Sequence, residues 1–337
     1  MPATKTTLFA AAAAAIVAAP ASAQLAFNFT FNGGTTAQRQ AAVEAGQLWA
    51  DVFNDDITLN LTLNYQNLGG GLAFAQSPTV GRSYTDTLAA LTADATSLDD
   101  VQALTTLPVG PDIGFWTRKN GATVFDDNGT GNNNFLDVNR ANAKALGLLS
   151  GTDGASDGSI TVNSTLPYDF NRSNGINSNQ LDIVGVIAHE IGHVMGFVSF
   201  TDILDNGNSS IDNFRELTVL DLYRRKDSTG NDVNVTPGGD PYLSIDSGAT
   251  RLGNASSGGN IGDGFQASHW ENRGFGGEPG DVIGIMDPQI AFGELQFIRQ
   301  PDITAFDVIG YSLVPEPGSL AFLGFGAVGL LARRRRA

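Results

Sequence analysis

The 337-residue chain contains no cysteine. Disulfide bonds and every catalytic mechanism that uses a thiolate are therefore excluded. Histidine is almost as scarce, since the chain has only three. Basic residues are also few, with 19 Lys and Arg against 35 Asp and Glu. A surface with this excess of negative charge repels nucleic-acid phosphates and anionic membranes, so the composition predicts no nucleic-acid partner.

The first 23 residues are typical of a secretory signal peptide. Lys5 supplies one positive charge before an apolar run at 8–19, and Ala21-Ser22-Ala23 is a small-residue cleavage site. The sequence therefore predicts export, with a mature chain that begins near Gln24.

The last segment, residues 314–337, has three parts: a Pro-Glu-Pro triplet at 315–317, an apolar stretch at 320–332 and four arginines at 333–336. The apolar stretch is shorter than the ~20 residues of a stable membrane-spanning helix, and the arginines fit the positive-inside bias. Both features favour a segment that is anchored in the membrane only temporarily. A permanent C-terminal anchor is the alternative.

This layout closely resembles the PEP-CTERM sorting signal of Gram-negative bacteria. The resemblance implies recognition by an exosortase-type sorting enzyme and transient membrane contact through the tail. It also implies secretion across the inner membrane, toward the cell envelope or the exopolysaccharide outside the cell.

The region between the two ends, residues 24–313, keeps 14 basic and 34 acidic residues, a net charge of −20. Apolar residues alternate at 25–31 and again at 57–65, while residues 36–53 show helical spacing. Strand, helix and strand in this order predict a crossover unit. Further segments extend the pattern to an α+β fold, a sheet backed by helices: strands at 71–75, 112–118, 121–125 and 159–164, and helices at 83–94, 98–107 and 140–149.

The stretch "VIAHEIGHVMGF", residues 186–197, lies on a predicted helix. Apolar residues recur on one stripe from Val184 to Val194, and Ser178 or Asn179 can cap a helix that runs from Gln180 to about residue 195. This stripe can bury against the sheet.

His189 and His193 are four residues apart, so their imidazoles lie on the same face of that helix. Two imidazoles so placed can bind one Zn²⁺, while Glu190 can act on a water at the metal. The pattern predicts peptide hydrolysis with Glu190 as the general base.

A catalytic zinc site usually has a third protein ligand. One candidate is His269, the only other histidine. The second is Glu216, which lies 23 residues after His193 with Asp221 nearby, as in a thermolysin-like arrangement of two histidines and a glutamate. Sequence favours His269 because Met286 follows it in a turn-like context, but Glu216 stays open.

The motif extends to Gly196, and together these residues resemble the metzincin metalloproteases. Most metzincins place the third histidine three residues after that glycine, where this chain has Ser199. A long insertion before His269, followed by Met286, resembles the leishmanolysin-like branch. Many metzincins carry a tyrosine two residues after the methionine; Pro288 stands here, so the donor to the transition state is unassigned.

The metzincin resemblance implies a twisted, mostly parallel sheet with backing helices, an antiparallel edge strand and a zinc cleft. Residues 24–196 would form an N-terminal catalytic subdomain that ends with the zinc-binding helix. Residues 197–313 would form an irregular C-terminal subdomain with the third ligand and the methionine turn. On this analogy residues 159–164 would be the edge strand that pairs with substrate.

A weaker pattern lies between Asp126 and Asp137, where five residues match positions of an EF-hand calcium loop. The threonine and aspartate at its fifth and twelfth places are poor ligands, and the flanking helices are unconvincing. A solvated loop rich in Asn and Gly is the alternative to calcium binding.

Two classes of function follow from these patterns. The first is a secreted zinc endopeptidase that acts on protein or peptide substrates. The second is a non-catalytic matrix or adhesion protein that keeps a protease-like fold with structural zinc. The intact glutamate beside the two histidines favours the first class, because a structural site does not need it.

Overall fold

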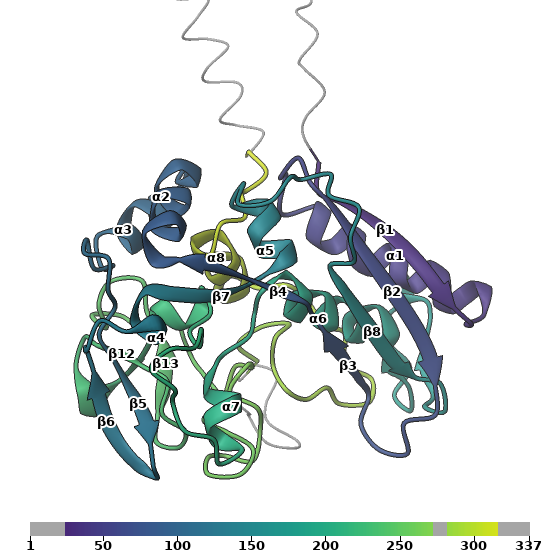
Figure 1. Ribbon diagram of the computed structural model, residues 1–337. Helices are drawn as coiled ribbons and strands as arrows, with labels where there is room; N and C mark the ends of the chain where they lie inside the picture. The colour runs from purple at the N-terminus through teal and green to yellow at the C-terminus, as the bar shows by residue number, and fades with distance from the viewer. Residues whose placement is uncertain (1–23, 272–281, 316–337) are drawn as a thin grey trace, which may run out of the picture.

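The computed structural model describes residues 24–271 and 282–315 (Figure 1). The expected signal peptide at 1–23 lies outside these residues, as does nearly all of the expected sorting signal at 314–337. Within the described part, no helix combines the length and hydropathy needed to span a membrane.

A four-stranded sheet has the order β1-β2-β8-β3. Its strands are β1 (Ala26–Asn32), β2 (Thr58–Gln66), β8 (Gly158–Asn163) and β3 (Ala73–Gln76). The first three are parallel, whereas β3 runs antiparallel to β8 and forms one edge (Figure 1). The crossover unit predicted from residues 25–65 supplies the parallel pair β1 and β2.

The two faces of the sheet differ because its strands alternate apolar and polar residues. On β2, Leu59, Leu61 and Leu63 are buried in the core. On the opposite, exposed face, Asn28 donates to Asn60 across β1 and β2, with 2.9 Å between Nδ2 and Oδ1. The apolar face therefore packs on helices while the polar face meets water.

Helices α1 (Thr36–Ala50) and α6 (Ile183–Met195) pack against each other and against this sheet. The buried Trp49 of α1 joins them, since its indole Nε1 donates to the Ala188 carbonyl of α6 at 2.9 Å. Its ring meets Phe306 of α8 (Gln300–Val308) edge to face, with centroids 4.6 Å apart. The helix that carries the two motif histidines is thereby fixed between sheet and helices.

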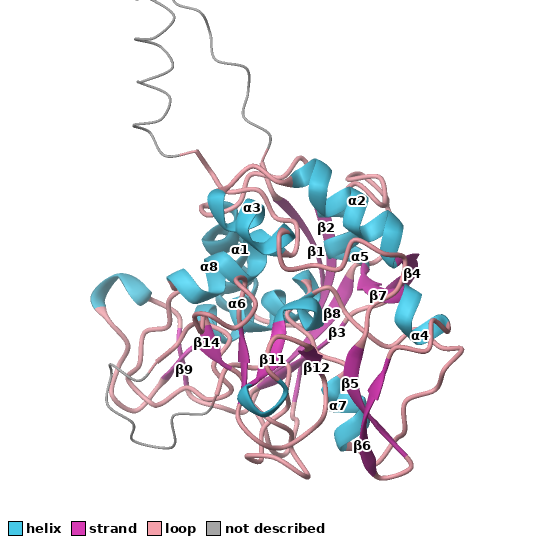
Figure 2. Cartoon of the chain, turned by 90° about the vertical axis from the view of Figure 1, so that its left-hand side faces the viewer, coloured by secondary structure: helices cyan, strands magenta, loops and turns pink. Residues whose placement is uncertain are grey.

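The other elements are short, and many of them lie on the far side of α6 from the sheet (Figures 1 and 2). The helices are α2 (Tyr84–Asp94), α3 (Leu98–Leu104), α4 (Gly131–Asn134), α5 (Arg140–Ala145) and α7 (Thr201–Asp205), with 3₁₀ turns at 172–174, 220–223 and 227–229. The strands are β4 (Thr79–Ser83), β5 (Phe115–Lys119), β6 (Ala122–Asp126), β7 (Phe135–Asn139), β9 (Tyr168–Asp169), β10 (Leu181–Asp182), β11 (Arg224–Lys226), β12 (Val233–Asn234), β13 (Pro241–Leu243) and β14 (Gly253–Asn254).

Two local expectations are wrong. Residues 159–164 were expected at the sheet edge, but β8 has β2 on one side and β3 on the other, so the edge strand is β3. Helix α6 begins at Ile183 rather than Gln180, because Leu181 and Asp182 pair with β9 as a short strand. Hydrogen bonds to residues distant in sequence decide both cases.

The last described residues fold back onto the turn after α1. Asn54 N donates to the Ser312 carbonyl at 2.9 Å, and Val314 N donates to the Val52 carbonyl at 2.8 Å. The Asp55 carboxylate accepts the Ser312 N–H at 3.2 Å. The chain is thus held in the fold up to the residue before the Pro-Glu-Pro triplet.

Several carboxyl groups gather near this place with few cations. Burial raises the pKa of Asp55 to about 7, and the same cause, with repulsion from Asp100, Asp99 and Asp94, raises that of Asp307 to about 7. Oδ2 of Asp307 accepts the Ser97 hydroxyl at 2.5 Å, while Oδ1 is buried with no hydrogen-bond partner among the described residues. These groups favour the folded state when protonated.

We expect Asp307→Asn to stabilise the protein at alkaline pH. The folded-state pKa of Asp307 lies above its unfolded value, so the stability it contributes is present below about pH 4 and is lost as the pH rises through about 7. The free energy of unfolding of the variant, relative to wild type, should rise by on the order of 2–4 kcal/mol between about pH 4 and about pH 8. Denaturant titrations at several pH values measure it.

The matched control is Asp56→Asn, because this exposed carboxylate stays in water in both states. A difference between wild type and Asp307→Asn that does not change with pH would contradict the prediction.

Candidate metal centre

The three histidines of the chain meet at one point. The Nε2 atoms of His189 and His193 lie 3.1 Å apart, and each lies 3.2 Å from Nε2 of His269. The first two come from α6, and the third comes from an irregular segment 76 residues after His193. Within the described residues, this is the only group of three or more metal-binding side chains.

Backbone carbonyls fix the tautomer of each imidazole. Nδ1 of His189 lies 2.7 Å from the Ile285 carbonyl, and Nδ1 of His193 lies 2.8 Å from the Phe197 carbonyl. Nδ1 of His269 lies 3.1 Å from the Gln266 carbonyl. Because a carbonyl only accepts, each Nδ1 carries the proton and each Nε2 presents a lone pair.

Three lone pairs at this separation repel one another unless a cation lies between them. The short contacts between the Nε2 atoms are therefore not hydrogen bonds. A tetrahedral zinc ion with nitrogen ligands at about 2.0–2.1 Å places those nitrogens about 3.3 Å apart, close to the distances found here. The donor set and its spacing thus fit zinc.

Protonation of the imidazoles is strongly disfavoured. Burial lowers the pKa of His189 to about 3 and that of His193 to about 4, and the repulsion of His193 adds to the first shift. Burial and the two other histidines lower the pKa of His269 as well. The three rings stay neutral near pH 7, the form that binds a metal.

At two positions of the motif, the local structure explains why the residue is glycine. Gly196 ends α6 with φ of 122°, a backbone conformation that side chains rarely adopt. This turn brings the Phe197 carbonyl to His193. Gly192, between the two motif histidines, leaves room for Met286, whose Sδ a Cβ at this position would overlap. Met286 thus packs directly against the turn of helix that presents both imidazoles.

Glu190 lies on α6 between the two histidines and lines the same cleft. Its side chain is only 6% exposed, and burial raises the pKa of its carboxyl group to about 8. One carboxylate oxygen, Oε2, has no hydrogen-bond partner. A buried carboxyl group with a free oxygen is suited to accept or return a proton.

The cleft that contains these residues measures about 1140 Å³. One wall is β3 with the residues before it, and another is formed by residues 287–292 after Met286. Near the start of α6 the lining is mainly apolar, with one amide, Gln296: the apolar residues are Leu72, Leu166, Leu181, Val186 and Ile290. Near its end the lining includes Asp137, Asn139, Glu216 and Thr218. No lysine or arginine lines the described part of the cleft.

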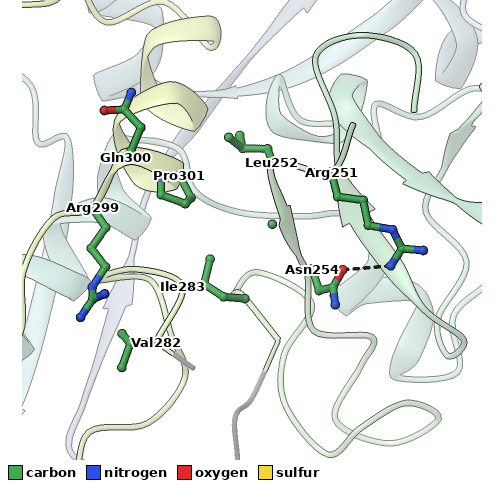
Figure 3. Close-up of a pocket in the computed structure, with 9 residues that line it drawn as sticks. Arg251, Leu252, Asn254, Val282, Ile283, Arg299, Gln300 and Pro301 are labelled. Atoms are coloured by element: carbon green, nitrogen blue, oxygen red, sulfur yellow. Dashed lines mark hydrogen bonds between the residues drawn. The ribbon is translucent and has the colours of Figure 1, made fainter. Parts of the chain in front are cut away.

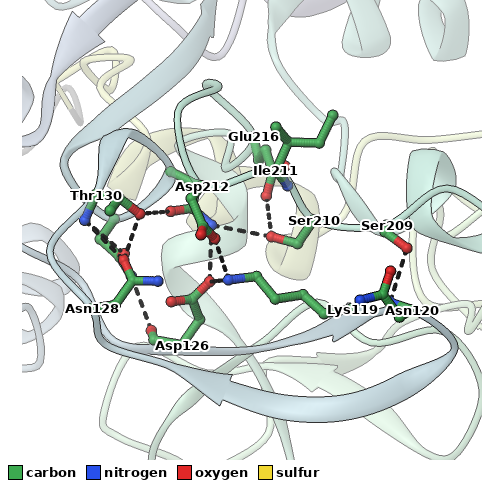
Figure 4. Close-up of polar contacts among 12 residues, drawn as sticks. Lys119, Asn120, Asp126, Asn128, Thr130, Ser209, Ser210, Ile211, Asp212 and Glu216 are labelled. Atoms are coloured by element: carbon green, nitrogen blue, oxygen red, sulfur yellow. Dashed lines mark hydrogen bonds and ion pairs between the residues drawn. The ribbon is translucent and has the colours of Figure 1, made fainter.

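Glu216 lies at the cleft margin but does not join the histidines. Its Oε2 accepts the Ser210 hydroxyl at 2.6 Å, and its Oε1 accepts the Ile211 N–H at 2.5 Å (Figure 4). No α-helix forms around Glu216; the nearest helical element is the 3₁₀ turn at 220–223. Asp221 is also engaged, since it accepts the Phe200 N–H at 2.9 Å. The structure thus gives Glu216 a loop-stabilising position in place of the thermolysin-like one.

The expected calcium loop also has other partners. The ammonium group of Lys119 binds Asp126 at 2.7 Å and contacts Asp212 as well (Figure 4). Asp137, the twelfth position, lies on β7 and pairs with Arg215 at 3.5 Å. Strands β6 and β7 flank the loop where an EF-hand has helices. This arrangement favours a hydrogen-bonded loop over calcium ligation.

A second hollow lies between β14 and the start of α8 (Figure 3). Among the described residues that line it, Arg251 and Arg299 are the only charged ones, and their guanidinium groups point away from each other. Arg251 is bound to Asn254 at 3.0 Å and also pairs with Asp227 at 2.5 Å. Its described lining has no convergent polar groups and includes none of the three histidines.

Comparison with known proteins identifies one segment. Residues 313–336 match the model of the PEP-CTERM protein-sorting motif. The motif implies recognition by an exosortase-type sorting enzyme and export toward the cell envelope or the outside of a Gram-negative bacterium, as expected from residues 314–337. No curated protein and no solved structure matches the chain.

Sequence alone did not reveal the parts of the site that come from the backbone. The carbonyl groups of Ile285, Phe197 and Gln266 set the imidazole tautomers, yet any residue type can supply a carbonyl. A strand was predicted at 71–75, but nothing in the sequence placed it beside the histidines. Only the side chains with distinctive chemistry could be named in advance.

We expect His269→Ala to lose bound zinc and Glu216→Ala to keep it. Removing one of three convergent imidazoles leaves two, too few for a stable zinc site, whereas Glu216 bonds to Ser210 and Ile211 and is not one of the convergent ligands. Elemental analysis after gel filtration should give about one zinc per chain for wild type and Glu216→Ala, and close to none for His269→Ala. Full zinc content in His269→Ala would contradict this assignment.

Proposed function

We propose that the protein is an exported zinc-dependent endopeptidase of the metzincin type, with His189, His193 and His269 as metal ligands and Glu190 as the general base. The observation that carries the proposal is the convergence of three Nε2 lone pairs within 3.2 Å. They lie in a large cleft that also contains a buried glutamate.

The residues divide the chemistry among them. Zinc on three imidazoles would keep one position for water, lower the pKa of that water toward 7 and polarise a peptide carbonyl. Glu190 accepts the proton of the attacking water and returns it to the leaving amine. The carbonyls that bind each Nδ1 hold the rings in the required tautomer and orientation.

The free edge of β3 offers a way to align the substrate. β3 pairs with β8 on one side, and its other side borders the cleft. An extended peptide could add there as a further strand, with main-chain hydrogen bonds that are independent of its sequence. Such alignment suits an endopeptidase, because it requires no chain end.

We expect Glu190→Gln to keep zinc and lose nearly all activity. The amide has nearly the same shape but cannot accept a proton, and general acid–base catalysis contributes about 10²- to 10⁴-fold. Casein hydrolysis and zinc content are measured on the same samples. Glu216→Gln is the matched control, because it alters another buried glutamate of the same cleft.

Retained hydrolysis in Glu190→Gln would rule out its role as general base. Zinc binding by wild type without hydrolysis of any protein would favour the non-catalytic alternative.

Cleavage should favour bulky apolar side chains beside the scissile bond. The cleft near the start of α6 is lined by Leu181, Val186 and Ile290, and burying one large aliphatic side chain contributes about 1.5–3 kcal/mol. We expect kcat/KM at one position next to the cleaved bond to be at least about tenfold higher for Leu than for Asp. Mass spectrometry of a peptide library measures this, and a preference for acidic residues there would contradict it.

A further inference from the structure

The third histidine reaches the metal centre on a segment that is neither helix nor strand. It lies 76 residues beyond His193, whereas the other two imidazoles are fixed by one turn of α6. The position of its Nε2 atom therefore depends on whatever holds residues 266–270. Two carboxylates hold this segment. Asp202 binds the residues just before His269, and Asp302 binds the residue just after it.

Asp202 of α7 holds the residues immediately before His269. Its Oδ1 accepts the Ala267 N–H at 2.6 Å, and its Oδ2 accepts the Ser268 N–H at 3.2 Å. The Ser268 hydroxyl also donates to Oδ2. Hydrogen bonds to a charged acceptor are roughly twice as strong as neutral ones, so this one side chain fixes two successive residues.

Ser199 adds to this contact from the position where a compact metzincin motif has its third histidine. Its N–H donates to the Ser268 hydroxyl oxygen at 2.9 Å. Its own hydroxyl donates to Asp221 at 2.6 Å. Ser199, which stands where that motif has a histidine, thus helps to hold the segment that carries His269.

Asp302 of α8 holds the residues after His269 together with the methionine turn. Its Oδ1 accepts the Trp270 Nε1–H at 2.8 Å and the Met286 N–H at 3.3 Å. Its Oδ2 accepts the Ile285 N–H at 2.8 Å. The carboxylate is fully buried, and Gly284 passes so close that a Cβ there would overlap it.

Asp302 also reaches a second histidine through the backbone. Asp302 accepts the N–H of Ile285. The carbonyl of the same residue lies 2.7 Å from Nδ1 of His189. Trp270, bound to the other oxygen, directly follows His269, and its N–H donates to the Met286 carbonyl at 3.1 Å. The hydrogen bonds of one carboxylate thereby connect the segments that hold His189, His269 and the methionine turn.

We propose that Asp202 and Asp302 act as positioning residues, a two-carboxylate clamp that sets His269 at the distance a metal requires. The clamp rests on the proposed metal-binding role of the histidines but does not depend on peptidase activity. Neither carboxylate belongs to the group of convergent ligand atoms, so both act through the segment they bind.

The test compares Asp202→Asn and Asp302→Asn with Asp100→Asn. Asp100 is a buried aspartate of α3 that likewise accepts two backbone N–H groups, those of Thr96 at 2.9 Å and Ser97 at 3.0 Å. It does not line the cleft. Zinc affinity is measured by competition with a chelator, the ligand field by visible absorption of the Co²⁺-loaded protein, and stability by thermal unfolding of the metal-free protein.

We expect Asp202→Asn and Asp302→Asn to weaken zinc binding about 10- to 100-fold, as is typical when the partners of metal ligands are removed. Their Co²⁺ absorption should also differ from wild type. Asp100→Asn should lower only the unfolding temperature. If the clamp variants lower that temperature as Asp100→Asn does but keep the wild-type zinc affinity and Co²⁺ spectrum, the proposal is overturned.

Two milder variants decide the matter should the asparagine variants not fold. Ser268→Ala removes a donor to Asp202, and Trp270→Phe removes a donor to Asp302. Each should weaken zinc binding about two- to tenfold, the equivalent of one hydrogen bond. Unchanged zinc affinity in both would overturn the clamp. Zinc binding by wild type without hydrolysis would overturn only the proposed function, and wild type that binds no zinc would overturn both.

Discussion

The mutual repulsion of three imidazole lone pairs is the interaction around which this protein is arranged. Each Nε2 faces the other two at 3.1–3.2 Å. A proton on Nε2 would relieve this contact, but burial lowers the pKa of all three imidazoles and disfavours it. Such an arrangement is costly for the chain alone and favourable with a divalent cation. The surrounding fold must therefore hold the rings in place against this repulsion.

Rigid secondary structure supplies part of this restraint, and carboxylates supply the rest. Helix α6 is fixed by Trp49 and by the sheet, so the first two histidines need little else. The irregular C-terminal region has no disulfide to restrain it, because the chain has no cysteine. Buried aspartates take that part: Asp205, Asp221 and Asp302 each accept at least two backbone N–H groups. The acidic composition thus has a structural use besides its effect on partners.

The sorting motif is continuous with the folded body. It begins at residue 313, and Val314 is still hydrogen-bonded to Val52 of the turn after α1. The nearby Asp55 carboxylate, whose pKa burial raises to about 7, accepts the Ser312 N–H. The last residues of the fold are therefore also the first residues of the sorting motif.

The sequence by itself determined the features that local patterns control. Alternation predicted β1 and β2, helical spacing predicted α1, and the four-residue spacing of His189 and His193 predicted one helical face, because each depends on neighbours within a few residues. The tail was readable from its composition in the same way.

Tertiary structure alone decided everything that depends on residues distant in sequence. It put β3, rather than residues 159–164, at the sheet edge, and it started α6 after a short strand. It brought His269 to the motif histidines and the Ile285 carbonyl to Nδ1 of His189. The physical reason is that contacts such as those of His269 with His193 and of Ile285 with His189 join residues 76 and 96 positions apart, and one-dimensional spacing carries no record of which segments pack together.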